Sequence, residues 1–243
     1  MQSGPMIIGH RGIPVLAPEN TLAGIEKALE LGADGIEIDV HLSQDGHVVV
    51  CHDERVDRTS DGKGAIAELT LAQLKEMDFG SWFDSSFTGE RIPLLSEVLE
   101  LFRGNAAWLN IELKTNVTPY PGIVQKTVEL LREYDMMERT CISSFNHYTL
   151  VETQEVAPEL PTALLYSACL YQPWQYAVGM KAKGLHPAYY TVDEATVSAT
   201  KESGLFINPW TVDRTEDMER LARYQVTGII TNRPGLLRQV LGR

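Results

Sequence analysis

Eight short apolar runs alternate with stretches of helical spacing along the 243 residues of the chain, which predicts an α/β fold. Strands that alternate with helices form a parallel sheet, and eight such units in about 240 residues fit a (β/α)8 TIM barrel. The alternation has one long break, after the second run, which predicts a small insertion there. An open doubly wound sheet is the alternative, but the sequence lacks the Gly-rich phosphate loop of such sheets.

The apolar runs are the predicted barrel strands. In chain order they cover residues 6–9, 35–40, 108–114, 140–145, 162–166, 186–192, 205–212 and 228–231. The predicted helices cover residues 20–31, 94–102, 122–133, 147–157, 173–183, 194–203, 215–224 and 236–241. In the first helix, Leu22, Ile25 and Leu29 fall on one face, and Gly32 provides the stop signal.

Residues 41–92 interrupt the alternation, and we expect them to form a small insertion within a single domain that spans residues 1–243. The insertion begins as a hairpin, with a turn at 43–46 and a returning strand at 47–52. A Gly-rich loop at 60–64 and a short helix near 71–77 follow. Because the insertion leaves the carboxyl end of a barrel strand, where barrels carry their active sites, it is expected to contribute to the site.

Composition and charge exclude several classes of protein. The formal net charge is −12 and no cluster of Lys and Arg stands out, which argues against a nucleic-acid partner. The sequence has neither an apolar run of about 18 residues nor a signal-peptide pattern. Cys51, Cys141 and Cys169 lie far apart in apolar segments and predict buried, reduced thiols. We therefore expect a cytoplasmic protein without stable membrane insertion; a homodimer stays open.

Three acidic side chains on neighbouring strands are the candidate metal ligands. Glu37 and Asp39 are two residues apart in a strand and so face one point. Two unpaired carboxylates about 4 Å apart would repel by on the order of 4 kcal/mol at an effective dielectric near 20, so either one is protonated or a cation lies between them. Glu112 on the third strand completes the set, and three carboxylates favour Ca²⁺ or Mg²⁺ over zinc. The competing interpretation pairs them with Arg or Lys in salt bridges alone.

Cationic side chains end the strands beside these acids. His10 and Arg11 end the first strand, at the edge where barrel sites lie. Arg11, with Lys114 on the third strand, supplies positive charge for an anion such as phosphate. His52 ends the returning hairpin strand and can fold over the barrel mouth opposite His10. Two histidines near a metal-held anion make a general acid and a general base, and the sequence does not say which is which.

The remaining aromatic and histidine side chains have structural interpretations beside functional ones. Trp210, at the end of the seventh strand, offers an aromatic wall near the site or plain core packing. The other four histidines are interpreted as structural: His41 and His47 on the hairpin surface, His147 at a helix start and His186 at a strand start. Phe79, Trp82, Phe83 and Phe87 of the insertion pack its core, form a dimer contact or form an apolar rim for lipids.

In this order the motifs resemble the glycerophosphodiester phosphodiesterases, over nearly the whole chain. The matching segments are His10-Arg-Gly12, Ala17-Pro-Glu-Asn-Thr21, Glu37-Ile-Asp39-Val, Asp45-Gly with Val-Cys-His52-Asp53, Asn110-Ile-Glu112-Leu-Lys114, Trp210-Thr-Val and Gly228-Ile-Ile-Thr-Asn-Arg-Pro234. One departure is visible: Asn232 stands where an Asp is common in that family. It lies outside the metal set, so we expect it to adjust the rim of the site without abolishing catalysis.

The resemblance implies a (β/α)8 barrel with a small insertion after its second strand, and a role for each matched residue. The implied roles are His10 and His52 as the acid–base pair, Glu37, Asp39 and Glu112 as ligands of Ca²⁺ or Mg²⁺, Arg11 and Lys114 as phosphate contacts, and Glu19 and Asn20 as supports of the His-Arg end. Trp210 would line the substrate side.

The implied reaction is metal-dependent hydrolysis of a glycerophosphodiester, such as glycerophosphocholine or glycerophosphoethanolamine, to glycerol 3-phosphate and an alcohol. The alternative within enzymes is a lysophospholipase-D-like or phosphoinositide-type phosphodiesterase that acts on lipids. A barrel that only binds the diester is expected to lack a member of the set, and every member is present. A metal-dependent aldolase or isomerase would need a Schiff-base lysine or a base directed at an enolate, and Lys114 is the one candidate.

Overall fold

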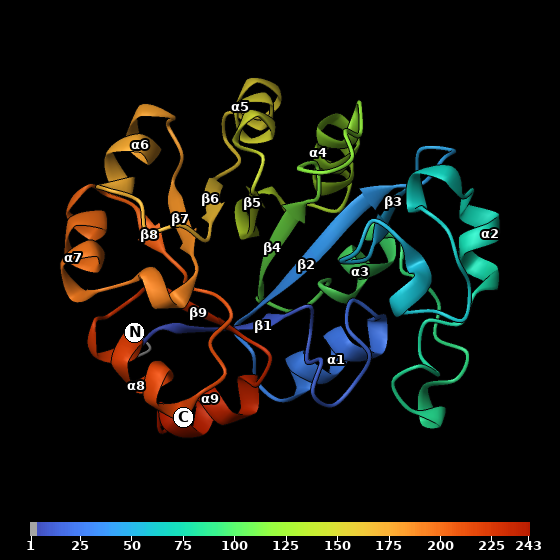
Figure 1. The fold of residues 1–243 in the computed structure, drawn as a ribbon, viewed down its shortest axis with the longest axis horizontal. Helices are drawn as coiled ribbons and strands as arrows, with labels where there is room; N and C mark the ends of the chain where they lie inside the picture. The colour runs from blue at the N-terminus through green and yellow to red at the C-terminus, as the bar shows by residue number, and fades with distance from the viewer. Residues whose placement is uncertain (1–3) are drawn as a thin grey trace.

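A ring of parallel strands forms the centre of the computed structural model, which describes residues 4–243 (Figure 1). The strands are β1 (Met6–His10), β2 (Gly35–Leu42), β4 (Trp108–Leu113), β5 (Thr140–Ser144), β6 (Thr162–Tyr166), β7 (Gly184–Pro187), β8 (Phe206–Ile207) and β9 (Gly228–Thr231). Their order is β8-β7-β6-β5-β4-β2-β1-β9, with parallel neighbours throughout. Backbone bonds from Thr227 to Ile207 (2.9 Å) and from Ile230 to Pro209 (3.0 Å) join the two ends. The predicted TIM barrel is confirmed.

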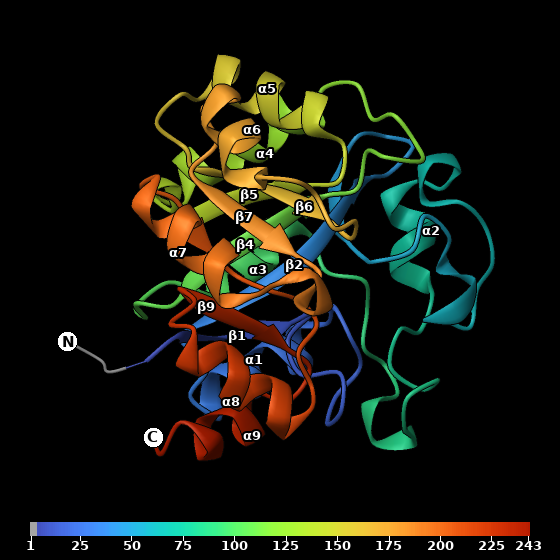
Figure 2. The ribbon, with the colours of Figure 1, turned by 60° about the vertical axis from the view of Figure 1, so that its left-hand side comes forward.

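The helices cover the outside of this ring (Figures 1 and 2). They are α1 (Leu22–Glu30), α3 (Leu95–Leu101), α4 (Ile123–Glu133), α5 (His147–Val156), α6 (Pro173–Gly179), α7 (Glu194–Glu202), α8 (Thr215–Arg223) and α9 (Pro234–Val240). Local capping starts several of them; the Thr21 hydroxyl, for example, accepts the Gly24 N–H at 3.2 Å at the start of α1. Their apolar faces pack on the ring, as Ile25 and Ala28 of α1 do at 0% exposure.

The register of β2 against its neighbours sets the geometry of the site. Glu37 pairs with Asn110 and Asp39 with Glu112 across β2 and β4, and His10 of β1 pairs with Glu37. Because side chains alternate between the two faces of a strand, these polar residues share the inner face. The apolar residues between them face the helices. Both faces of β2 are thus covered, which explains why all eight of its residues are buried.

Two predicted strands are shorter than expected. In the run at 186–192 the strand stops early, because β7 ends at Pro187. Tyr189–Thr191 form a 3-10 turn instead. The run at 205–212 contributes only β8, and the chain after it makes a single bridge from Ala188 to Trp210. Pro187 and Pro209 explain the difference, because proline has no N–H to donate to a ladder.

Residues 43–94 leave the ring between β2 and α3, and we call them the β2–α3 excursion (cyan and teal, right of Figure 1). It contains β3 (Val48–Val50), which pairs antiparallel with β2, then 3-10 turns at Val56–Arg58, Ile66–Glu68 and Ser85–Phe87, and helix α2 (Leu71–Glu76). It has its own buried apolar cluster, made of Val49, Cys51, Val56, Ile66, Leu74, Phe79 and Ile92. Asp78 fixes its far end by accepting the backbone N–H groups of Gly80, Ser81 and Gly89 at 2.6–2.8 Å.

The aromatic side chains of the excursion mostly contact one another. Phe79 is 4% exposed and belongs to the apolar cluster. The Trp82 ring donates from Nε1 to the Phe79 carbonyl at 2.9 Å and meets Phe83 edge-on, as Phe83 does Phe87. Trp82 keeps 38% exposure. These contacts agree with core packing of the segment, which was one of the three interpretations.

The predicted state of the cysteines is correct at two positions and wrong at one. Cys51 and Cys141 are buried, whereas Cys169 is exposed. Cys169 lies in the loop after β6, where an apolar run in the sequence continues past the end of the strand. Across residues 4–243, no helix combines the length and the apolar character needed to cross a bilayer.

Candidate active site

Three buried carboxylates meet at the inner face of β2 and β4. Glu37, Asp39 and Glu112 each offer one oxygen, and these oxygens lie within 4.8 Å of one another. The three residues are only 4%, 1% and 7% exposed. Carboxylate oxygens in this arrangement are the ligands that hard divalent cations prefer. The structure therefore brings together the acidic side chains that the sequence singled out.

Two cations offset only part of this negative charge. Lys114 Nζ lies 3.0 Å from Glu112 Oε1 and 3.7 Å from Asp39 Oδ1, and Arg11 Nε lies 3.4 Å from Asp39 Oδ2. Asp39 Oδ1 is nevertheless buried without a hydrogen bond, because the Lys114 ammonium lies closer to Glu112. With all three carboxylates ionised, salt bridges alone would therefore leave one negative charge and one buried oxygen unmatched. The residues present fit a divalent cation.

Burial and the crowding of like charges shift the pKa values of the three acids. Burial, and then the charge of Asp39, raises the pKa of Glu37 well above its usual value and the pKa of Glu112 to about 7. Burial would also raise the pKa of Asp39, but the charges of Arg11 and Lys114 hold it below its usual range. A bound cation favours the charged form of a carboxylate, so protons and metal compete for Glu37 and Glu112.

Arg11 links the carboxylates to the loop that precedes α1. Its backbone has a positive φ of 52°, and its N–H donates to Glu37 Oε2 at 3.0 Å. Its guanidinium donates to Glu19 Oε1 at 2.9 Å. Asn20 donates from Nδ2 to Asp39 Oδ2 at 2.9 Å. The two predicted supports, Glu19 and Asn20, thus contact the cationic residue and a carboxylate, respectively.

His10 ends β1 with its two ring nitrogens facing different partners. Nε2 lies 3.9 Å from Glu37 Oε2, and Nδ1 lies 2.7 Å from Asn232 Oδ1, just after β9. Burial, and then the charge of Arg11, lowers the pKa of His10 to about 4, so the ring is neutral near pH 7. The sequence predicts a role at the rim for Asn232. In the structure Asn232 contacts His10 directly.

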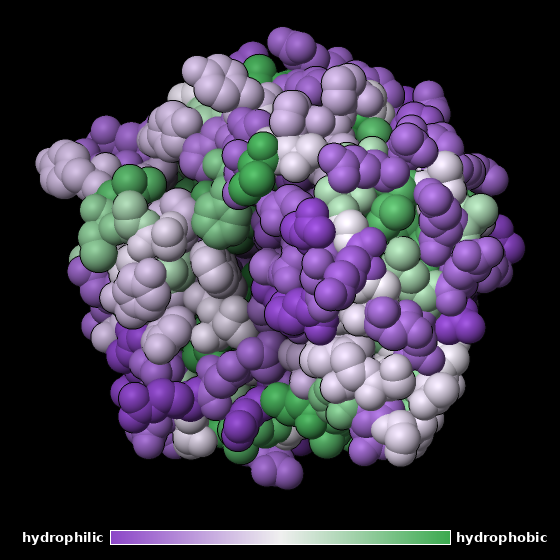
Figure 3. All heavy atoms as spheres, turned by 45° about the vertical axis from the view of Figure 1, so that its right-hand side comes forward, coloured by the Kyte–Doolittle hydropathy of each residue, from purple (hydrophilic) through white to green (hydrophobic). Residues whose placement is uncertain are grey.

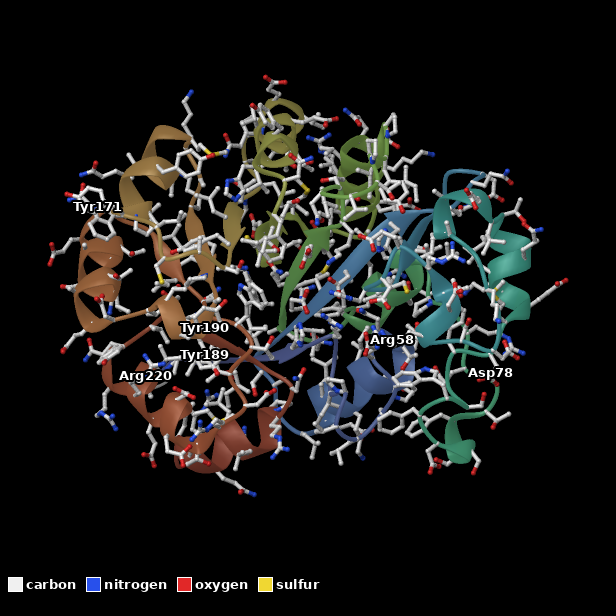
Figure 4. The ribbon with its side chains drawn as sticks, viewed as in Figure 1. Arg58, Asp78, Tyr171, Tyr189, Tyr190 and Arg220 are labelled. Carbon is white, nitrogen blue, oxygen red and sulfur yellow. The ribbon has the colours of Figure 1, made fainter. Side chains whose placement is uncertain are left out.

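His52 reaches the site from the β2–α3 excursion, two residues after β3. Its Nδ1 lies 2.7 Å from Asp53 Oδ1. Arg58 donates to both Asp53 oxygens (2.7 and 3.0 Å) and to both Glu19 oxygens (2.7 and 2.8 Å). Figure 4 labels Arg58 at the junction of the excursion with the α1 side of the barrel. Sequence reasoning missed Arg58, because no local spacing reveals a contact with Glu19 across 39 residues.

One cavity of about 120 Å³ joins the two histidines to the carboxylates. Its lining consists of His10, Arg11, Glu37, His52, Asn110, Glu112, Phe145, Leu165, His186, Trp210 and Ile230. Four of the singled-out residues lie outside this lining and contact Arg11 or Glu112, which belong to it: Asp39, Lys114, Glu19 and Asn20. The cavity therefore has a charged side and an apolar side. On the face drawn in Figure 3, a hollow is likewise bordered by hydrophilic side chains on one side and by paler or hydrophobic ones on the other.

The apolar side is built around Trp210, as the functional interpretation of this residue expects. Its Nε1 donates to the His186 carbonyl at 2.8 Å, and its ring meets Phe145 edge-on with centroids 5.5 Å apart. Trp210 is partly exposed rather than core. His186 is fully buried within β7 and lines the cavity, so it is more than the strand start that the sequence indicates.

The prediction that His41 lies on the hairpin surface is wrong. His41 is 0% exposed, and its ring contacts the Tyr120 hydroxyl (3.0 Å) and the His52 carbonyl (3.2 Å). The physical reason is that β2 runs on to Leu42 with both faces covered, so the hairpin starts later than the polar residues suggest. His47 is exposed and His147 starts α5, as expected.

Comparison with known proteins identifies several similar chains. A model of the glycerophosphoryl diester phosphodiesterase family matches residues 10–236. A glycerophosphodiester phosphodiesterase from Caldanaerobacter subterraneus subsp. tengcongensis is 47% identical over 232 residues, which are 96% of each chain. The structure of a phosphodiesterase from Oleispira antarctica, in complex with the product sn-glycerol-3-phosphate, has a TM-score of 0.90 and 31% identity over 99% of this chain and 98% of that one. The structure of a glycerophosphodiester phosphodiesterase from Agrobacterium tumefaciens has a TM-score of 0.85 and 31% identity over 97% of this chain and 99% of that one.

Proposed function

The chain belongs to the glycerophosphoryl diester phosphodiesterase family, and from this premise we propose that it hydrolyses glycerophosphodiesters with the help of a divalent cation and two histidines. The products are glycerol 3-phosphate and an alcohol, and glycerophosphocholine and glycerophosphoethanolamine are the substrates we expect. The observation that carries the proposal is the single cavity shared by His10, His52, Arg11 and the carboxylates Glu37 and Glu112. We also propose that residues 1–243 form one catalytic domain in which 41–92 are an insertion.

We assign Glu37, Asp39 and Glu112 as the ligands of the cation, Ca²⁺ or Mg²⁺. When bound, such a cation neutralises the phosphodiester, whose negative charge otherwise repels nucleophiles. Arg11 lines the same cavity and adds a fixed guanidinium that can hold two phosphate oxygens. Lys114 does not line the cavity; its ammonium lies 3.0 Å from Glu112 and stabilises the charge of the ligand set from behind.

The two histidines divide the proton transfers between them. His10 is neutral near pH 7, so it can accept the proton of the attacking hydroxyl, which comes from the substrate's own glycerol or from water. His52 is held at Nδ1 by a carboxylate, which leaves Nε2 to give a proton to the leaving alcohol. Attack by the glycerol hydroxyl would pass through a cyclic phosphate that water then opens.

Release of glycerol 3-phosphate from glycerophosphocholine tests this function. The enzyme is stripped with EDTA and assayed alone and after addition of Mg²⁺ or Ca²⁺. We expect no release from the stripped enzyme and restored release with at least one of the two cations. Release that persists at full rate without metal would contradict the proposed need for a cation. No release with either metal, from folded protein, would contradict the proposed substrate class.

The alternative that acts on lipids is not favoured. The relative from Caldanaerobacter subterraneus subsp. tengcongensis, which matches 96% of the chain, is named for glycerophosphodiesters, and the Oleispira antarctica structure holds sn-glycerol-3-phosphate. In this chain Phe79 is buried within the excursion, so it cannot serve as part of an apolar rim.

A further inference from the structure

A chain of two short hydrogen bonds runs from His10 away from the cavity. His10 Nδ1 lies 2.7 Å from Asn232 Oδ1, and Asn232 Nδ2 donates to Asp213 Oδ2 at 2.7 Å. Asn232 follows β9, and Asp213 lies between β8 and α8. Backbone hydrogen bonds between these two segments close the barrel. The hydrogen-bonded path from His10 is therefore anchored in the barrel and not in the β2–α3 excursion.

Asp213 is itself fixed by Asn232 and by the residue before it. Its Oδ1 accepts the Asn232 backbone N–H at 2.8 Å and the Thr231 hydroxyl at 3.1 Å. Thr231 is fully buried and also accepts the Arg233 N–H at 3.0 Å. The carboxylate therefore has one oxygen tied to the backbone and presents the other to the amide of Asn232.

This arrangement leaves only one orientation for the amide. An ionised carboxylate can only accept hydrogen bonds, so the amide group that faces Asp213 must be the NH₂. The carbonyl oxygen of Asn232 then faces His10, and it too can only accept. His10 must therefore carry its proton on Nδ1, which leaves the lone pair on Nε2, the nitrogen that lies 3.9 Å from Glu37.

We propose that Asp213 and Asn232 are positioning residues that hold His10 as the Nδ1–H tautomer, with Nε2 unprotonated and aimed into the cavity. The inference rests on the proposed function in so far as His10 takes a proton there. Neither residue touches the cavity, so both act through His10. The amide of Asn232 is the necessary link between them. Its NH₂ donates to Asp213, and its carbonyl oxygen accepts the proton of His10 Nδ1.

The tautomer can be read directly by nitrogen NMR of histidine labelled with ¹⁵N, near neutral pH, without any activity. The His10 signals are assigned by their loss in His10→Gln. In the unaltered protein we expect a protonated Nδ1 and an unprotonated Nε2. In Asp213→Asn the neighbouring amide can turn, so we expect a mixture of the two tautomers. Nε2–H as the main form of the unaltered protein would overturn the proposal.

Kinetics of a swapped pair give a second and independent test. Asp213→Asn and Asn232→Ala are each expected to lower kcat about 10- to 100-fold with KM little changed, as for other residues that orient a functional side chain. The double variant Asp213→Asn/Asn232→Asp exchanges carboxylate and amide: Asn at 213 donates to Asp at 232, which accepts from His10. We expect it to recover the Nδ1–H tautomer and most of kcat.

Asp217→Asn is the matched control, because it removes one carboxylate from the first turn of α8, where Asp217 pairs with Arg220 at 3.0 Å. We expect an unaltered tautomer and kcat in this control. A double variant no better than Asp213→Asn, in folded protein, would overturn the proposal. If the unaltered enzyme cleaves no glycerophosphodiester, the proposed function fails, whereas the NMR result still decides the role of Asp213 and Asn232.

Discussion

His10 and His52 face one cavity, but two differently built regions hold them. The His10 region belongs to the barrel, and its contacts run through an amide at the partly buried carboxyl ends of β1 and β9. The His52 region belongs to the excursion, and it is held by the ion pairs of Asp53, Arg58 and Glu19, with the Arg58 side chain 45% exposed.

The two kinds of support respond to different conditions. Buried groups depend on packing and on which groups are protonated, whereas partly exposed ion pairs are weakened by salt. The comparison teaches that the His10 region should respond to pH and the His52 region to ionic strength, although we propose the same reaction for both.

The largest expected effect comes from removing either histidine, which tests whether both regions contribute equally to kcat. His10→Ala and His52→Ala should each lower kcat by about 10²- to 10⁴-fold, because each removes one proton-transfer group. Release of glycerol 3-phosphate measures the loss, and titration with Mg²⁺ or Ca²⁺ should show little change in metal affinity. His47→Ala, an exposed histidine, is the control. Activity near that of the control in both variants would refute the acid–base pair.

A second substitution separates the carboxylates from both histidine regions. Glu112→Gln keeps the size of the side chain but removes a charge from the proposed ligand set, so metal affinity should fall by at least the roughly 10- to 100-fold that outer contacts of metal sites supply. Calorimetric titration of stripped enzyme measures it. Glu129→Gln on the exposed side of α4 is the matched control. An unchanged titration would remove Glu112 from the set.

Between about pH 6.5 and pH 4.5, a loss of stability should come from the barrel side. Burial lowers the pKa of His186 to about 3 from an ordinary 6.5. Below that ordinary value the unfolded chain binds a proton that the folded chain excludes, so this contribution to stability is full above about pH 6.5 and is lost progressively on acidification.

The variant His186→Gln should therefore lose less stability on acidification than the unaltered protein. The difference should be about 1 to 3 kcal/mol between about pH 6.5 and pH 4.5, measured by urea unfolding at both pH values. His47→Gln, at an exposed site, should behave like the unaltered protein. Parallel losses in all three proteins would show that burial of His186 contributes no pH dependence.

The smallest expected effect is on the excursion side. Arg58→Ala should lower kcat/KM about 10-fold, because His52 then loses the link through Asp53 to Glu19. It should also flatten the decrease of kcat/KM with added salt. Arg55→Ala, which breaks an exposed pair with Asp57, is the control. If Arg58→Ala keeps both the rate and the salt dependence, the support of His52 is not electrostatic.

The sequence predicts the barrel and the acidic cluster because both depend on local patterns. Alternation places Glu37 and Asp39 on one face of one strand, and Glu112 follows the same rule on the next strand. Pro187 and Pro209 also carried a readable signal, since each ends a ladder.

Contacts between segments far apart in the chain could not be predicted in this way. Arg58 meets Glu19, and Asn232 meets His10 across 222 residues, only after the loops are placed in space. His41 looks polar and exposed in the sequence, and its burial depends on Tyr120, which belongs to a later loop.

The pairing of β2 with β4 has a consequence for folding fidelity. In the native register Glu37 lies beside Asn110, and Asp39 lies beside Glu112. A slip of one residue would turn the polar side chains of β4 toward the helices and bury them among apolar groups. The polar residues of the candidate site thus also raise the free energy of misaligned barrels. The groups that we propose for the reaction therefore also help the chain to reject a wrong strand alignment.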